Sequence, residues 1–244
     1  MDKDWSYPGR ELESMAIAAN YRRWILAKLG PFLGQRIVEV GAGTGSFSEL
    51  LLERKPQSLL ALEPSSNLYP LLWQKLSRMN FPIHIEAMQS TLSHAVPQLA
   101  GSAEPDSILY INVLEHVEDD LEELRVAHSM LASSGRVLVF VPAHQWLMGP
   151  FDHKVGHFRR YTRSSLITTV EGAGFTIRFS AYFDLLGILM WWLKYRVFKS
   201  DQMEAGLVSL YDRWGVPLSR ILDSITNSQM GKNVIVIGEK RGTS

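Results

Sequence analysis

The stretch "VEVGAGTG", residues 38–45, decides the fold class. It continues the apolar segment 36–40, and Gly41, Gly43 and Gly45 let the backbone turn sharply and let a ligand approach closely. A helical pattern follows in "SFSELLLERK", residues 46–55, whose positive N-terminal end would point at that ligand. The order of strand, glycine turn and helix predicts a cofactor site at the end of a strand.

Further apolar runs repeat along the chain at helix-length intervals. Runs without alternation are typical of strands covered on both faces, and such intervals indicate parallel strands joined by helices. The sequence therefore predicts an α/β fold with a doubly wound sheet. The expected strands are residues 36–40, 58–63, 82–88, 106–112, 135–142, 176–183 and 232–240.

The remaining segments predict one domain over residues 1–244. We expect an N-terminal helix over 11–29, a cofactor-binding core over 36–142, a substrate loop over 144–161 and a helical insert over 184–229. The 25 basic and 25 acidic residues balance, which disfavours a nucleic-acid partner. No cysteine is present, so disulfides, thiolate metal sites and cysteine nucleophiles are excluded.

The first residues lack the features of a signal peptide, and the uncharged run 185–193 is too short to span a bilayer, which takes about 20 residues. We expect a cytoplasmic protein without a transmembrane segment. Contact with a membrane surface and the oligomeric state stay open.

Two acidic residues indicate which cofactor the glycine turn accepts. A dinucleotide site would prefer a third glycine where this chain has Ser46, and an apolar residue where it has Glu39. A carboxylate there suits a cationic ligand. Glu63, at the end of the next expected strand, is placed to accept both hydroxyls of a ribose. A nicotinamide-dependent oxidoreductase and a non-catalytic cofactor-binding protein remain alternatives.

The segments "VEVGAGTG", "LALEPS" (60–65), "DSILYINVLEHVEDD" (106–120) and "LASSGRVLVFVP" (131–142) together resemble the class I S-adenosylmethionine-dependent methyltransferases. The resemblance implies a Rossmann-like seven-stranded sheet in the order 3-2-1-4-5-7-6, with strand 7 antiparallel. It also implies S-adenosyl-L-methionine as cofactor and S-adenosyl-L-homocysteine as product. A tract reading "D…GH.RRYT" further resembles one bacterial subgroup of this family.

The resemblance also assigns cofactor contacts. Glu39 would lie near the methionine amino group and Glu63 on the ribose, while the chain carries Ser90 and Thr91 where many members have an acidic residue near the adenine. The residues expected at the cofactor are Tyr21, Glu39, Gly41, Gly43, Gly45, Glu63, Pro64, Ser90, Thr91, Asn112 and Val113.

Methyl transfer from a sulfonium is an in-line displacement, so the protein aligns the acceptor and excludes water. A base is needed only where the acceptor atom carries a proton. His116, after the fourth expected strand, is a candidate base, because an imidazole can change protonation near neutral pH. Its acidic neighbours in the sequence would favour the charged form if they came close to it. The alternative is that Glu115 and His116 organise the first helical turn. We expect no metal, because Asp152, His153 and His157 in one loop do not make a ligand set.

The segment "FDHKVGHFRRY", residues 151–161, follows the fifth expected strand and so faces the ligand side of the sheet. His157 is its candidate base. The expected acceptor-binding residues are His153, Arg159, Arg160 and Tyr161. The alternative is a lid fixed by a pair between Asp152 and an arginine, and the two roles can coexist.

The insert 184–229 contains the apolar stretch "LLGILMWWLKYRVF". It predicts a helix packed on the domain or on a second subunit, a cap over an apolar acceptor, or a helix lying on a membrane surface. The sequence thus predicts a methyltransferase that acts on a small-molecule, apolar or lipid-like acceptor.

Overall fold

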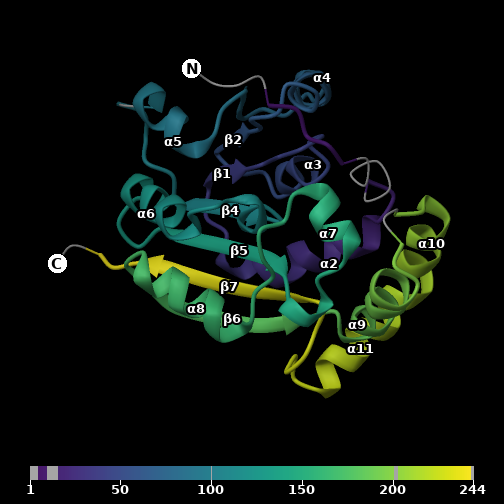
Figure 1. Ribbon diagram of the computed structural model, residues 1–244. Helices are drawn as coiled ribbons and strands as arrows, with labels where there is room; N and C mark the ends of the chain where they lie inside the picture. Colours follow the sequence, from purple (N-terminus) through teal and green to yellow (C-terminus); the bar gives the residue numbers. More distant parts are fainter. Residues whose placement is uncertain (1–4, 10–15, 100, 201–202, 243–244) are drawn as a thin grey trace.

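The computed structural model describes residues 5–9, 16–99, 101–200 and 203–242. A seven-stranded sheet runs through its middle (Figure 1). The strands are β1 (Arg36–Val40), β2 (Ser58–Leu62), β3 (His84–Met88), β4 (Ser107–Ile111), β5 (Arg136–Pro142), β6 (Phe175–Phe183) and β7 (Asn233–Lys240). Each of the seven lies within two residues of the range expected from the sequence.

The strand order is β3-β2-β1-β4-β5-β7-β6, and β7 runs antiparallel to β5 and β6. The expected topology is therefore confirmed. Because β1 and β4 are neighbours that connect to opposite halves of the sheet, their carboxyl ends form the crevice where ligands bind in this fold. Because β7 is antiparallel, its first residue, Asn233, and the preceding Lys232 lie at that same edge.

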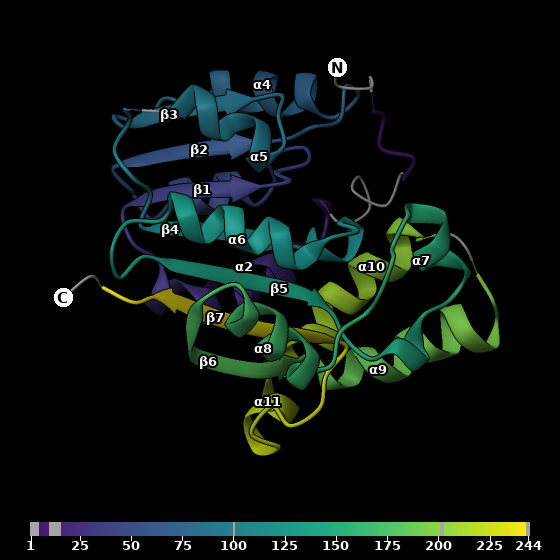
Figure 2. The same cartoon turned by 60° about the vertical axis from the view of Figure 1, so that its left-hand side comes forward.

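Helices cover both faces of the sheet, as the turned view in Figure 2 shows. Successive residues of a strand point to opposite faces, so Ile37 packs with α2, α3 and α4, while Val38 packs with α5, α6 and α8. The helices are α2 (Ala19–Leu29), α3 (Ser48–Leu52), α4 (Tyr69–Ser77), α5 (Leu92–Ala95), α6 (Asp120–Met130), α7 (Pro150–Val155), α8 (Arg163–Gly172), α9 (Leu185–Trp191), α10 (Ala205–Leu210) and α11 (Val216–Ile225).

Two segments differ from the expectation. The helix expected over 11–29 begins at Ala19 as α2, and residues 11–15 lie outside the described residues. The loop expected over 144–161 contains the short helix α7, which ends at Gly156 in a left-handed conformation. Asp152 accepts the Gly149 backbone N–H at 2.8 Å and so closes the start of α7. At the start of the next helix, α8, the Thr162 hydroxyl accepts the Ser165 backbone N–H at 3.0 Å and caps the helix.

The insert is helical, and its buried aspartates fasten it to the rest of the protein. Asp212 accepts the backbone N–H of Asn20 and of Tyr21 at the start of α2. Asp223 accepts the N–H of Asp184 at 2.8 Å, where β6 passes into α9. Such buried charge-assisted bonds fix the insert against the sheet edge. Among the described residues, no helix is long and apolar enough to cross a membrane.

Candidate active site

A cavity of about 850 Å³ opens at the carboxyl edge of the sheet. It is bounded by the glycine turn after β1, the ends of β2 and β4, the segment around α7, and the start of β7. Trp191 and Met203 of the insert also line it. The cavity thus lies where the fold predicts a ligand and reaches under the insert.

The glycine turn has the conformation that the sequence predicted. Gly41, Gly43 and Gly45 have φ values of +67°, +58° and +75°, in the left-handed region that favours glycine. At Gly41 a Cβ atom would lie 2.6 Å from Cγ2 of Val113, so no larger residue fits there. The backbone of residues 41–44 consequently forms part of the cavity wall.

Glu63 braces this turn from the end of β2. Its carboxylate accepts the Gly43 backbone N–H at 2.7 Å and the Ser65 backbone N–H at 3.0 Å, as well as the Ser65 hydroxyl. The residue is buried yet lines the cavity. A carboxylate offers about four acceptor positions, so it retains capacity for ligand hydroxyls. This donor set fits the ribose of the expected cofactor.

Glu39 lies deeper, beneath the glycine turn. The Ser48 hydroxyl donates to its carboxylate at 2.5 Å. Burial raises the pKa of Glu39 to about 8, against the opposing effect of the Ser48 hydrogen bond. A cationic group beside a buried carboxylate would favour its charged form, in agreement with the ammonium group expected there.

The other residues expected at the cofactor lie around the same cavity. Pro64, Ser90, Thr91, Asn112 and Val113 all line it. Asn112 has a positive φ of 53°, and its backbone N–H donates to Phe140, which turns the chain at the end of β4.

Of the two remaining residues expected at the cofactor, Tyr21 lines the cavity and Gly45 does not. Tyr21 lines the cavity and donates its hydroxyl to Asn233 at 2.9 Å. Gly45 is not among the lining residues; a Cβ atom there would lie 2.9 Å from Leu72 Cδ1. Gly45 therefore serves the packing of α4 rather than the ligand.

Asp152 and His157 form a hydrogen-bonded pair at the acceptor side of the cavity. The imidazole Nδ1 lies 2.8 Å from Asp152 Oδ1, and the Asp152 side chain is fully buried. Burial raises the pKa of Asp152, but the His157 hydrogen bond and the Arg160 charge outweigh it and lower the pKa overall. An ionised carboxylate only accepts hydrogen bonds, so Nδ1 of His157 carries the proton and Nε2 is left as an acceptor.

Arg160 holds the same aspartate. Its guanidinium donates to Asp152 at 2.8 Å and to the Ala143 carbonyl at 3.2 Å, and it lies 4.6 Å from the ring centroid of Trp191. The pair of Asp152 with an arginine, expected as the alternative to a substrate role, is thus present together with the histidine contact. Arg160 lines the cavity.

The other three residues expected at the acceptor lie outside the cavity. His153 is exposed on α7. Arg159 turns to Asp120 at 3.0 Å, and the Tyr161 hydroxyl donates to the same carboxylate at 2.7 Å. These contacts fasten the segment to the start of α6. We therefore propose no acceptor contact for His153, Arg159 or Tyr161.

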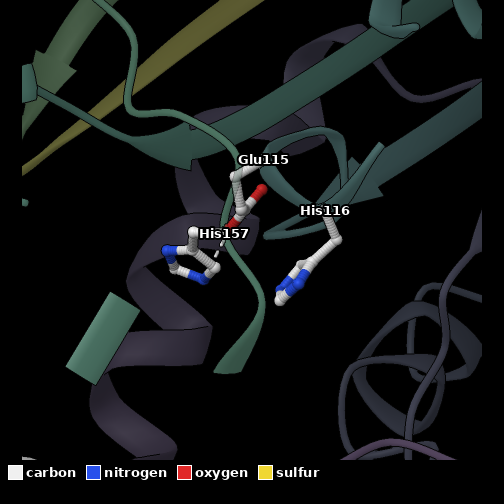
Figure 3. A group of neighbouring side chains, drawn as sticks. All are labelled: Glu115, His116 and His157. Carbon is white, nitrogen blue, oxygen red and sulfur yellow. Dashed lines mark ion pairs between the residues drawn. The ribbon is translucent and has the colours of Figure 1, made fainter. Parts of the chain in front are cut away.

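Glu115 and His116 belong to a 3₁₀ turn, Leu114–His116, that follows β4. Figure 3 shows both side chains with His157, which approaches from the segment after α7. Glu115 Oε1 lies 4.0 Å from His157 Nε2, and burial raises the pKa of Glu115 to about 7.

His116 differs from the expectation. Burial and the neighbouring His157 lower its pKa to about 4, so acidic neighbours do not make it an imidazolium at neutral pH. The acidic residues that are its neighbours in the sequence therefore do not set its charge, because burial has the larger effect on its pKa.

Glu115, His116 and His157 each offer a ligand atom, and these atoms lie within 4.8 Å of one another. Among the described residues, neither oxygen of Glu115 has a hydrogen-bond partner, although both are buried. The three residues could therefore hold a metal ion, in a combination that joins the end of β4 to the segment after α7.

Sequence reasoning missed Trp191, Lys232 and Asn233, which all line the cavity. For the last two a signal existed: a polar pair directly precedes the apolar run of the last strand. Because that strand is antiparallel, its first residues lie at the carboxyl edge of the parallel strands. Trp191 gave no such signal, since an apolar helix residue is equally suited to the core.

The strand order, the glycine turn and the acidic residue that braces it define the class of S-adenosylmethionine-dependent methyltransferases. Residues 13–178 match a family model described as "Methyltransferase domain". That range is more than half of the chain, which therefore belongs to this family.

The comparisons with individual proteins agree. A ubiquinone biosynthesis O-methyltransferase of Aeromonas salmonicida (strain A449) is 25% identical over 172 residues, covering 64% of this chain and 68% of that protein. A SAM-dependent methyltransferase from Archaeoglobus fulgidus has a TM-score of 0.58 at 16% identity, covering 90% of this chain and 94% of that one. A mycolic acid cyclopropane synthase, CmaA1, complexed with SAH and CTAB has a TM-score of 0.58 at 15% identity, with coverages of 96% and 88%.

Proposed function

We propose that this methyltransferase acts on a hydroxyl group of a small, largely apolar molecule, with His157 as the base. The observation that carries the proposal is the buried Asp152–His157 pair at the wall of the cavity. The O-methyltransferase named for ubiquinone biosynthesis supports oxygen as the acceptor atom.

The cofactor would be held by the glycine turn, with Glu63 on the ribose and Glu39 beneath. When bound, it supplies a methyl group: the acceptor oxygen forms the new C–O bond as the S–C bond breaks. Ser90 and Thr91 lie where the adenine edge is expected and offer hydroxyl and backbone groups.

His157 would take the proton of the acceptor hydroxyl. Its Nδ1–H donates to Asp152, which leaves Nε2 free to accept and stabilises the imidazolium once it forms. Arg160 is a positioning residue, since its guanidinium fixes Asp152. His116 touches the His157 ring edge-on at 4.6 Å and, being neutral, holds the ring in place.

An apolar acceptor is supported by the lining on this side of the cavity. Phe151 and Trp191 pack edge-on with their ring centroids 5.5 Å apart, and Val155 and Met203 lie beside them. Apolar walls with a few polar groups are typical of small-molecule sites.

We propose that no metal takes part. Ligand atoms around a zinc ion at about 2.0–2.1 Å are roughly 3.3 Å apart, whereas Glu115 Oε1 and His157 Nε2 are 4.0 Å apart. The Arg160 guanidinium beside them and the sulfonium of the cofactor would both repel a cation.

The test replaces His157 by alanine and measures both methyl transfer to phenolic acceptors and affinity for S-adenosylhomocysteine. We expect turnover to fall by about 100-fold or more, as for other bases, with cofactor affinity unchanged. His153→Ala is the matched control, because that histidine is in the same segment but outside the cavity. Equal losses of turnover and affinity would contradict the base role. Cofactor binding without turnover on any acceptor would instead favour a non-catalytic cofactor-binding protein.

A further inference from the structure

The insert ends in a long helical segment whose outer face is apolar. Helices α10 and α11 continue into each other from Ala205 to Ile225 through a π-helical turn, Tyr211–Gly215. Six large apolar side chains along it are exposed, at spacings of three or four residues that place them on one face. They are Leu207, Leu210, Trp214, Leu218, Ile221 and Ile225. We call this set the outer stripe.

The opposite face of the same segment carries the polar groups. Asp212, Ser219 and Asp223 are buried there, and each is hydrogen-bonded to the backbone of α2 or of the start of α9. A surface helix of a globular protein normally turns its apolar residues inward and its polar residues to water. Here the inner face does bury Val216 in the core, but six further large apolar side chains remain in contact with water while polar groups are buried. The outer stripe is therefore expected to meet an apolar environment.

The charged side chains of the insert are also sorted by sign, with most basic groups exposed and the described aspartates buried. Arg196, Lys199, Arg213 and Arg220 are exposed. Among the described residues of 184–229, the exposed carboxylate is that of Glu204, which lies 3.7 Å from Lys194. All three described aspartates of this range are buried. The outer surface of the insert is therefore apolar and cationic, although the whole chain has no net charge.

We propose that the outer stripe binds the surface of an anionic lipid bilayer, with the helical segment lying flat in the interface. Apolar side chains would enter the acyl region, while Arg213 and Arg220 would meet the headgroups. A second copy of the chain is a weaker partner for this face. A two-fold contact through the stripe would bring like charges together, whereas anionic headgroups neutralise them.

The neighbouring helix connects this surface with the cavity. Trp191 at the end of α9 lines the cavity, and the next residue, Trp192, is exposed. Trp192 and Leu189 also line an open groove of about 400 Å³ on the outer side. An apolar acceptor dissolved in the bilayer would reach the cavity beneath the insert. This consequence rests on the proposed function, but lipid binding itself does not.

The test is co-sedimentation of the full chain with vesicles of phosphatidylcholine alone or mixed with phosphatidylglycerol. We expect binding to the anionic vesicles that weakens with added salt. Replacing Trp214 and Ile221 together by serine removes two side chains from the stripe and should weaken binding by about 100-fold. Arg213→Gln and Arg220→Gln should each weaken binding to anionic vesicles by about fivefold.

Trp73→Ser is the matched control, because Trp73 is 57% exposed on α4, away from the insert, and this variant should bind vesicles as the parent does. Retained affinity for S-adenosylhomocysteine shows that each variant is folded. No binding to anionic vesicles, or equal binding by the double variant, would overturn the proposal. So would a dimer in solution that the double variant dissociates, since the stripe would then be covered by a second copy. Vesicle binding needs no acceptor, so these outcomes are independent of methyl transfer.

Discussion

Replacing Glu63 by alanine tests the cofactor site at a side chain that accepts three hydrogen bonds. In the free protein the Glu63 carboxylate accepts the backbone N–H of Gly43 and of Ser65. Both donors are buried, and a buried donor left without a partner costs about 1–3 kcal/mol. We expect the variant to lose about 3 kcal/mol of unfolding free energy, which lowers Tm by roughly 6–12 °C for a chain of this size.

The effect on ligand binding should be separate and larger. Two hydroxyl hydrogen bonds to a charged acceptor contribute about 1.5–3 kcal/mol each, so affinity for S-adenosylhomocysteine should fall by about 100-fold or more. Titration calorimetry measures the affinity and thermal unfolding the stability. Glu63→Gln keeps an oxygen acceptor for one N–H, so it should lose less stability but still bind the ligand weakly.

Glu86→Ala is the control, since it removes a half-exposed carboxylate from the neighbouring strand β3. It should leave both quantities unchanged. A Glu63→Ala variant with a lower Tm but an unaltered dissociation constant would contradict the contact between Glu63 and the ribose. Glu63 would then be only a brace for the glycine turn, and the ribose would lie elsewhere.

Three further predictions concern the same site. Gly41→Val should abolish binding of S-adenosylhomocysteine, because its Cβ atom would lie 2.6 Å from Val113 at a φ of +67°; an unchanged affinity by calorimetry would contradict the placement of the turn. His116 has a folded pKa of about 4 against about 6.5 when unfolded, so its contribution to stability is present above pH 6.5 and is lost as the pH falls toward 4. Relative to His116→Gln, the parent protein should thus lose up to about 3 kcal/mol of unfolding free energy over that pH range, as measured by urea unfolding. If the unfolding free energies of the two proteins changed with pH in the same way, the pKa of His116 would not be lowered by folding. Methyl transfer should continue in excess EDTA. If EDTA instead removed the activity, added Zn²⁺ or Mg²⁺ restored it, and the Glu115→Gln variant did not respond to EDTA, then Glu115, His116 and His157 would be ligands of a metal ion.

The sheet and the glycine turn could be predicted well, for local reasons. Glycines with positive φ at positions 41, 43 and 45 leave few alternatives to a tight turn after a strand, and a buried strand with helix-length flanks leaves few alternatives to parallel pairing. The acceptor end could be predicted only in part. Among the candidates of the segment 151–161, the sequence does not distinguish His157, which faces the cavity, from His153, which faces solvent.

Local patterns in the sequence thus specify the fold class, because periodicity and turn chemistry indicate parallel strands joined by helices. The strand order followed from the resemblance to the class I methyltransferases, and the sheet confirms it. The arrangement of side chains at the acceptor side depends on how the helices and loops pack. Helix α7 turns His157 and Arg160 onto one buried aspartate, and Arg159 away from it. Burial lowers the pKa of His116, and it depends on packing between distant segments. The same packing buries the described aspartates of the insert and leaves its outer stripe exposed. The contacts of the insert, such as that of Asp212 with Tyr21, join residues 191 positions apart, so no local pattern encodes them.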